Sequence, residues 1–165
     1  MKTVCLLLGA MIIWISQGYS QAWAGSARLS LPDDFSGYRH IHSLVINDRE
    51  SPLFGFHHFY VNETGWETFK NQGPFPYPQG TVFLGAVYKV AQDGEQYNEG
   101  EGAAYTMMEK DPAAEATGGW LFGTFTPDGE LIDQDVQNAC FSCHQPRKEH
   151  DYVFSSPMEL ELPKP

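Results

Sequence analysis

The chain has 165 residues, of which 42% are hydrophobic and 14% aromatic, a composition typical of a globular protein of about one domain. Its 21 Asp and Glu residues outnumber its 10 Lys and Arg residues, giving a formal net charge of −11 at pH 7. No basic run occurs along the chain, which argues against nucleic acid as a partner. Three cysteines are too few for a disulfide-rich scaffold, so a packed apolar core must hold the fold.

The N-terminus has the pattern of a secretory signal. Lys2 precedes an apolar run of about a dozen residues, which ends ahead of the small-residue sequence Ala-Trp-Ala at positions 22–24. A membrane-spanning helix needs roughly 20 apolar residues, so an uncleaved anchor is the less favoured interpretation. We therefore expect residues 1–24 to be a signal peptide cleaved after Ala24, and residues 25–165 to form one domain that is periplasmic or otherwise exported.

Short runs of apolar, β-branched and aromatic residues bounded by Gly, Pro, Asn and Asp predict strands. Five such runs occur, at residues 38–46, 56–61, 81–90, 103–109 and 120–126. The turn-forming residues between them favour antiparallel meanders. Helices are predicted at residues 65–71 and 135–144, and an exposed hairpin loop at residues 95–102. The expected fold class is therefore mainly β (α+β), an antiparallel sheet with a few short helices.

Residues 140–144 read C-x-x-C-H, the pattern of covalent c-type haem attachment. In that chemistry two thiols add to the porphyrin vinyl groups, and the histidine that follows becomes the axial iron ligand. One helical turn brings both thiols to adjacent edges of the macrocycle. We therefore predict one haem c on a C-terminal attachment helix, with Cys140 and Cys143 as thioether anchors and His144 as the iron ligand. The exported chain would keep no other cysteine, because Cys5 leaves with the signal.

Two other interpretations of the cysteine pair stay open. One is a structural disulfide or a thioredoxin-like redox pair, although redox motifs of that kind begin a helix in a βαβ context, and no βαβ alternation is visible. The other is a structural zinc site, which needs four ligands. Only one C-x-x-C is present, so His144 and distant histidines would have to complete such a site.

Beyond this motif, the sequence resembles the cytochrome P460 family over most of the expected mature chain. The resemblance is carried by residues 55–62 (GFHHFYVN), 76–82 (PYPQGTV), 108–111 (MEKD), 140–144 (CFSCH) and 151–154 (DYVF). It implies an antiparallel sheet with a few helices, assembly as a homodimer, and a five-coordinate haem with His144 as the proximal ligand. Family members are linked to hydroxylamine oxidation, in P460 itself, or to binding of nitric oxide or carbon monoxide, in the β-sheet type of cytochrome c′.

The resemblance leaves open which branch this is, and so whether the protein is an enzyme. In P460 itself a lysine is covalently linked to the porphyrin, and this link accompanies hydroxylamine oxidation. Between Phe83 and Tyr88, where many relatives have a charged residue, this chain has no lysine. Lys70 and Lys89 are the remaining candidate cross-linkers, although each is better explained as a solvated residue at the end of a helix or strand.

Aromatic residues could form the wall that faces the open iron position. Four of them are candidates: Phe54, Phe56, Phe59 and Phe83. Ordinary core packing is the alternative for each of them. Met107 or Met108 could instead supply a sixth iron ligand. Arg39, Arg147 and Lys148 could pair with haem propionates.

From these patterns we expect an exported cytochrome with a five-coordinate iron that binds nitric oxide or another small ligand. The first alternative is a hydroxylamine-oxidising oxidoreductase, which needs the lysine link and a polar acid or base. The second is a six-coordinate electron-transfer cytochrome c with Met108 as the sixth ligand. The acidic composition predicts that any redox partner, such as another cytochrome, presents a basic surface.

Overall fold

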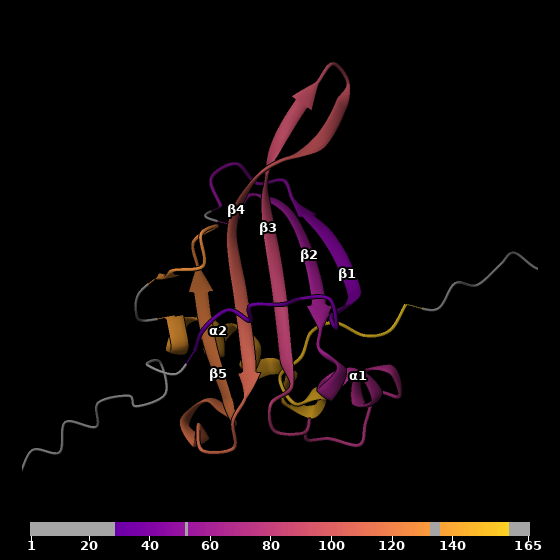
Figure 1. The fold of residues 1–165 in the computed structure, drawn as a ribbon, viewed down its shortest axis with the longest axis vertical. Coiled ribbons are helices and arrows are strands. Elements are labelled where there is room, and N and C mark those ends of the chain that lie inside the picture. Colours follow the sequence, from indigo (N-terminus) through magenta and orange to yellow (C-terminus); the bar gives the residue numbers. More distant parts are fainter. Residues whose placement is uncertain (1–28, 52, 133–135, 159–165) are drawn as a thin grey trace, which may run out of the picture.

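The computed structural model describes residues 29–51, 53–132 and 136–158. Its central element is a six-stranded antiparallel sheet in which each strand pairs with its neighbours along the chain, in the order β1-β2-β3-β4-β5-β6 (Figure 1). The strands are β1 (Arg39–Ile46), β2 (Gly55–Val61), β3 (Val82–Asp93), β4 (Gln96–Lys110), β5 (Trp120–Phe125) and β6 (Leu131–Ile132). The predicted meander and fold class are confirmed.

In the described residues, short helices connect and follow the strands; the two α-helices overlap the predicted segments at residues 65–71 and 135–144, whereas the two 3₁₀ helices were not predicted. The helices are α1 (Glu63–Lys70), η2 (Glu115–Thr117), α2 (Val136–His144) and η3 (Gln145–His150). Asn62 caps the N-terminus of α1, and its side chain accepts a hydrogen bond from the backbone N–H of Gly65 at 3.2 Å. Helix α2 contains the C-x-x-C-H motif, so the predicted attachment segment is helical.

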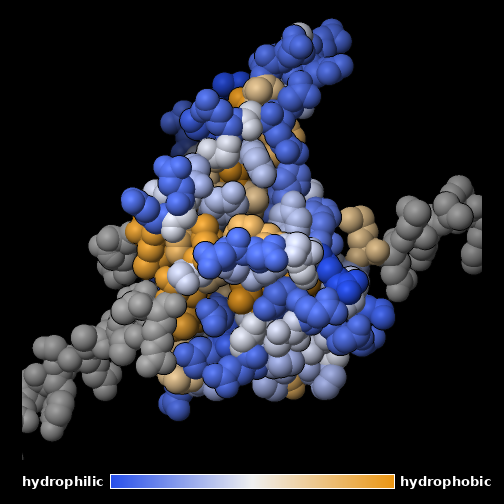
Figure 2. Space-filling view, in the orientation of Figure 1, coloured by the Kyte–Doolittle hydropathy of each residue, from blue (hydrophilic) through white to orange (hydrophobic). Residues whose placement is uncertain are grey.

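The prediction of a loop at residues 95–102 is wrong, because most of this segment is strand. β3 and β4 remain paired as far as Asp93 and Gln96, and only the two residues between them form the turn. The paired ends form an arm that projects beyond the rest of the sheet and carries hydrophilic residues (Figures 1 and 2). Both faces of this arm are exposed, so no apolar alternation marks it as strand. The two-residue strand β6 was not predicted either.

The sheet has a different cover on each face. One face packs against α1, α2 and the C-terminal segment, around a core of Ile41, Val61, Phe69, Tyr77, Phe83, Met108, Trp120, Phe122 and Val153. The other face packs against the segment at residues 29–38, around Leu29, Val82, Leu84, Met107, Leu121 and Phe125. In Figure 1 the N-terminal segment crosses in front of the strands, and α2 lies behind β5. The cysteine-bearing helix therefore belongs to one defined face.

No helix in the described ranges is long and apolar enough to cross a bilayer. The predicted signal peptide, residues 1–24, lies outside the described residues.

We expect Gly65→Ala to destabilise the fold, because a β-carbon at Gly65 would lie 2.9 Å from Val61 Cγ2 and closer still to Thr81 Cγ2. Both neighbours are fully buried and cannot move aside. Overpacking of this kind costs about 1–3 kcal/mol, more than the gain in helix propensity. The control is Gly102→Ala, whose β-carbon would meet nothing within 4 Å. Urea unfolding should show a loss for Gly65→Ala only, and equal losses would contradict the packing described here.

Candidate haem-attachment site

A buried glutamine attaches helix α2 to the edge of strand β5. On that edge β6 pairs only with Thr124 and Phe125, so the backbone of Phe122 needs other partners. The N–H of Phe122 donates to Gln137 Oε1 at 3.0 Å, and Gln137 Nε2 donates to the carbonyl of Phe122. One side-chain amide thus satisfies both backbone groups, as a neighbouring strand would. It fixes the first turn of α2 on the sheet.

Both motif cysteines are free thiols on α2. They are three residues apart, so they lie on the same side of the helix. Cys140 packs against the core on this face, whereas Cys143 is exposed. Burial, with a smaller contribution from Cys143, raises the pKa of the Cys140 thiol. The two thiols therefore lie on the same side of α2 but differ in their exposure to solvent.

His144 is the last residue of α2, and its neighbours fix the orientation of its ring. Its Nδ1 atom lies 2.7 Å from the carbonyl oxygen of Tyr152. A carbonyl can only accept, so Nδ1 carries the proton and Nε2 keeps its lone pair. Burial lowers the pKa of His144, although the bond to Tyr152 opposes this shift. The ring centroid is 5.3 Å from that of Phe122 and 4.8 Å from that of Phe154. The imidazole is therefore held neutral with Nε2 available to a metal.

On the sheet face under α2, residues paired across neighbouring strands form rows, and the size and burial of the side chains change from the row of Phe122 to the next one. Strand pairing places Phe122, Met108, Phe83 and Val61 in one buried row. The next row toward the arm consists of Thr124, Thr106, Gly85, Phe59 and His42. The Phe59 ring lies against Gly85, where a β-carbon would be 3.0 Å from Phe59 Cε1. We call this second row the small-residue row, because three of its five members are Thr or Gly.

A family model, Cytochrome P460, matches residues 32–155, a range that contains the whole sheet, both α-helices and the C-x-x-C-H motif. The chain belongs to the cytochrome P460 family. The matched range falls within the predicted domain at residues 25–165. A search of curated proteins found no match to the sequence.

Membership of the cytochrome P460 family implies a c-type haem, and the residues present fit this group. Covalent attachment needs two free thiols on one side of a helix, which Cys140 and Cys143 provide. Ligation of iron needs a neutral imidazole with a free nitrogen; burial favours the neutral form of His144, and its bond to Tyr152 places the proton on Nδ1 and leaves Nε2 free. The donor set thus agrees with the family on both counts.

The candidate wall residues of this P460-family chain do not lie together. Phe59 and Phe83 are on the α2 face, but Phe83 is only 6% exposed and belongs to the aromatic core. Its ring centroid is 5.2 Å from that of Tyr77 and 6.0 Å from that of Trp120. Ordinary core packing therefore accounts for Phe83. Phe59 is half-buried in the small-residue row.

Phe56 lies on the face of the sheet opposite α2, and Phe54 lies outside the strands. Phe56 pairs with Val45 and Tyr88, in the alternate register that points to the opposite face of the sheet. Phe56 therefore lies on the face of the sheet opposite α2. Phe54 precedes β2, and the guanidinium carbon of Arg49 lies 5.6 Å from the centroid of the Phe54 ring.

The two methionines are both buried and lie on opposite faces. Met107 belongs to the core under the N-terminal segment, and Met108 to the core on the α2 face. Strand pairing places Met108 between Phe83 and Phe122 in the buried row. Core packing explains the burial of both side chains.

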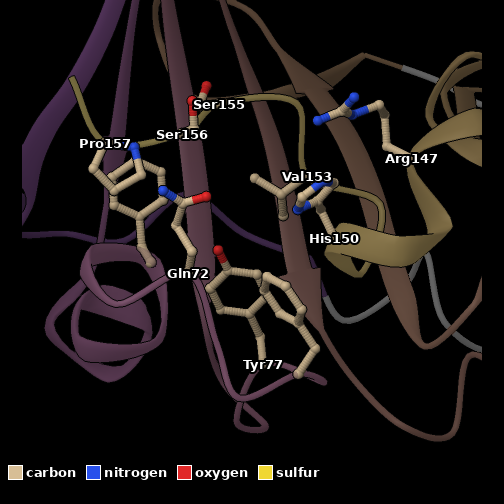
Figure 3. Close-up of a pocket in the computed structure, with 10 residues that line it drawn as sticks. Gln72, Tyr77, Arg147, His150, Val153, Ser155, Ser156 and Pro157 are labelled. Carbon is tan, nitrogen blue, oxygen red and sulfur yellow. The ribbon is translucent and has the colours of Figure 1, made fainter. Parts of the chain in front are cut away.

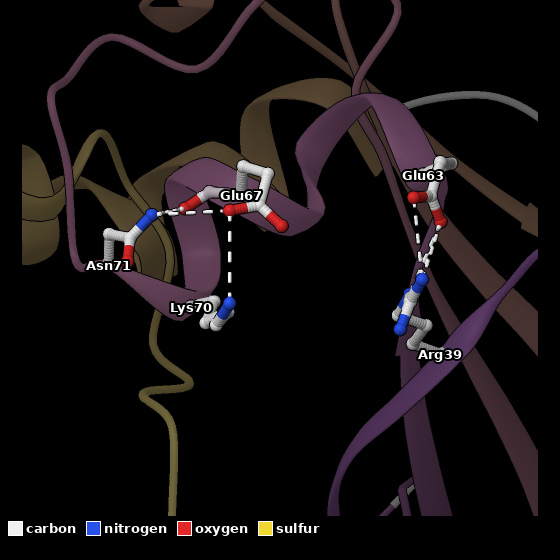
Figure 4. A network of polar contacts seen from close by, with 5 residues as sticks. All are labelled: Arg39, Glu63, Glu67, Lys70 and Asn71. Carbon is white, nitrogen blue, oxygen red and sulfur yellow. Dashed lines mark hydrogen bonds and ion pairs between the residues drawn. The ribbon is translucent and has the colours of Figure 1, made fainter.

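Lys70 and Lys89 both lie at the surface. Lys70 Nζ is 4.0 Å from Glu67 Oε2 in the last turn of α1, and the Arg39–Glu63 pair lies at the start of the same helix (Figure 4). Lys89 Nζ is 3.1 Å from Glu101 Oε2 in the projecting arm. The two lysine side chains are 55% and 63% exposed. Both therefore have the solvated positions favoured from sequence.

Arg147 lies beside the attachment residues and also borders a small pocket. Its guanidinium is 5.9 Å from the ring centroid of Phe154, which in turn contacts His144. On another side it lines a cavity of about 20 Å³ with Gln72, Tyr77, His150 and other residues (Figure 3). That volume holds about one water molecule, so this pocket is far too small for a porphyrin. Lys148 lines a different, open groove.

Sequence reasoning missed several residues that build the site. Gln137, Phe122 and the carbonyl of Tyr152 position α2 and His144 through contacts between distant segments. Only the DYVF block of the family resemblance could have indicated Tyr152. Nothing in the local sequence distinguishes Gln137 from a surface glutamine.

We expect alkylation by iodoacetamide to distinguish the two cysteines in the haem-free chain. The thiolate is the reacting form, so burial and the raised pKa of Cys140 should make it react several-fold more slowly than Cys143 at mildly alkaline pH. Peptide mass spectrometry over time measures both rates. In concentrated urea the difference should disappear. Equal rates in the folded chain would contradict the placement of Cys140 against the core.

Proposed function

We propose that this protein is an exported mono-haem cytochrome that binds nitric oxide or a ligand of similar size at a five-coordinate iron. The observation that carries the proposal is the state of His144. Its Nδ1 is committed to the Tyr152 carbonyl, and its Nε2 is free beside two free thiols, in a chain of the cytochrome P460 family. This combination suits haem ligation better than a disulfide or a zinc site.

The residues of α2 have separate tasks in this proposal. Cys140 and Cys143 would hold the haem through thioether bonds, each thiol adding across one vinyl group, with its sulfur on one vinyl carbon and its proton on the other. His144 would hold the iron through Nε2. The haem would supply an iron able to take up a small ligand.

The chain's other residues favour ligand binding over six-coordination. Met108, the candidate sixth ligand, is enclosed in the core between Phe83 and Phe122. Phe59 presents an aromatic ring from the small-residue row and is the candidate for the apolar wall. An apolar wall excludes water and lacks donors, so it favours reversible binding of a neutral diatomic.

The hydroxylamine-oxidising alternative has less support from the geometry. It needs a lysine joined to the porphyrin, and both candidates, Lys70 and Lys89, are solvated and paired with carboxylates. Export, assembly as a homodimer and a basic redox partner belong to the proposal as well. Their support is the signal-like N-terminus, the family resemblance and the net charge of −11.

Co-expression with a haem c maturation system tests the cofactor. The purified chain should gain the mass of one haem, show a high-spin c-type spectrum, and change that spectrum with nitric oxide. Cys140→Ser with Cys143→Ser should lose all covalent haem, whereas Ser142→Ala, an exposed position between them, should keep it. A wild-type chain without haem would overturn the proposal and favour the disulfide. A haem peptide joined to Lys70 or Lys89 would favour the enzyme.

Phe59 and Phe56 provide a matched test of the ligand wall, because they lie on the same strand and point to opposite faces. Phe59→Leu should change the association rate of nitric oxide or carbon monoxide with the reduced protein several-fold. Phe56→Leu should leave this rate unchanged. Stopped-flow mixing measures both. A larger effect from Phe56→Leu would place the ligand on the other side of the sheet.

A further inference from the structure

Lys110 and Asp151 form a buried ion pair where β4 ends. Lys110 Nζ lies 2.7 Å from Asp151 Oδ1, and the two side chains are 5% and 8% exposed. Lys110 also donates to the carbonyl of Gly118 at 3.3 Å and lies 4.8 Å from the ring centroid of Trp120. Two charges this deeply buried are tolerated only when they are paired and hydrogen-bonded, so each is committed to one position.

The second oxygen of the carboxylate binds a third segment of the chain. Asp151 Oδ2 accepts a hydrogen bond from the backbone N–H of Tyr77 at 2.8 Å. Asp151 itself has a left-handed backbone, with φ +51°, and its N–H closes η3 on the carbonyl of Lys148. The carboxylate thus attaches the end of η3 both to β4 and to the segment that carries Tyr77.

Tyr152, the residue after Asp151, is the one that binds His144. Tyr152 is also left-handed, with φ +68°, and its N–H donates to the carbonyl of Arg147 at 2.8 Å. Its own carbonyl accepts the bond from His144 Nδ1 at 2.7 Å. The Tyr152 ring packs against Phe141 of α2, 5.3 Å between centroids. Because Asp151 and Tyr152 are adjacent, the contacts that Asp151 makes with Lys110 and the Tyr77 N–H fix the position of the Tyr152 carbonyl.

We propose that the Lys110–Asp151 pair acts as a positioning pair for His144, holding the Tyr152 carbonyl against Nδ1 and thereby setting the strength of His144 as an iron ligand. The inference rests on the proposed function, because it concerns His144 as that ligand. A hydrogen bond from Nδ1–H makes the imidazole a stronger donor through Nε2. A stronger donor favours the oxidised iron and lowers the reduction potential.

Two variants remove the pair from opposite sides. Asp151→Asn keeps the shape of the side chain and an acceptor for Tyr77, but removes the charge that holds Lys110. Lys110→Met removes the cation and keeps most of the chain length. In both, the Fe–His stretching frequency of the reduced protein, measured by resonance Raman, should fall, and the reduction potential should rise. If Lys110→Met does not fold, the isosteric Asp151→Asn decides.

Two control variants separate positioning from stability. Lys89→Met breaks a lysine–carboxylate pair in the exposed arm, so it should change neither frequency nor potential. Gly65→Ala destabilises the fold at α1 and should also leave both unchanged. If Asp151→Asn and Lys110→Met behave like Gly65→Ala, the pair is only structural, and the inference is wrong.

A measurement on the haem-free full chain distinguishes failure of this inference from failure of the proposed function. Nitrogen-15 NMR of the histidine rings reports which nitrogen of His144 carries the proton. Wild-type protein should show the Nδ1–H form, and Asp151→Asn should show a mixture with the Nε2–H form. A wild-type chain that never acquires haem overturns the proposed function, while this readout still tests the positioning pair. An unchanged tautomer in Asp151→Asn overturns the pair.

Discussion

The buried ion pair between Lys110 and Asp151 holds the C-terminal segment on the sheet, and the geometry around His144 depends on it. Burial and the Asp151 charge raise the pKa of Tyr77, as an ionised carboxylate in a dry site should. At the other end of α2, Gln137 binds the edge of β5. The motif helix is therefore fixed at both ends, on the neighbouring strands β4 and β5. Between these two attachments lie the two thiols and the imidazole.

The face of the sheet under α2 divides into two parts with different roles. The row that contains Phe122 and Met108 is large, apolar and buried, and it provides the core against which α2 packs. The small-residue row has Thr and Gly at its centre, and the ring of Phe59 occupies the space that the missing side chain of Gly85 leaves. The buried row and the small-residue row are thus adjacent on the same strands. From the first row to the second, full burial gives way to half-burial at four of the five positions, and only Gly85 stays buried.

The sequence predicted those features that depend on local chemistry. Turn residues and short apolar runs gave the meander, and the three-residue spacing of Cys140 and Cys143 predicted their shared side of a helix. Features that depend on sheet register could not be predicted. The alternation of side chains along a strand shows which residues share a face, but not which face covers α2 or which residues of neighbouring strands pair. Phe56 and Phe59 differ by face, and Phe59 and Phe83 by row. The Lys110–Asp151 pair joins residues 41 positions apart, which no local pattern indicates.

The chemistry of the small-residue row bears on the choice between binding and turnover. Of its five members, only His42 is ionisable, and its ring stacks on Phe59 with centroids 6.3 Å apart. Oxidation of hydroxylamine releases protons, so an enzyme needs a positioned acid or base beside the substrate. A neutral diatomic has no such requirement, and hydroxyl, glycine and aromatic groups suffice for it. The composition of this row is therefore compatible with the proposed ligand binding, and His42, on strand β1, is the one residue in the row able to exchange a proton.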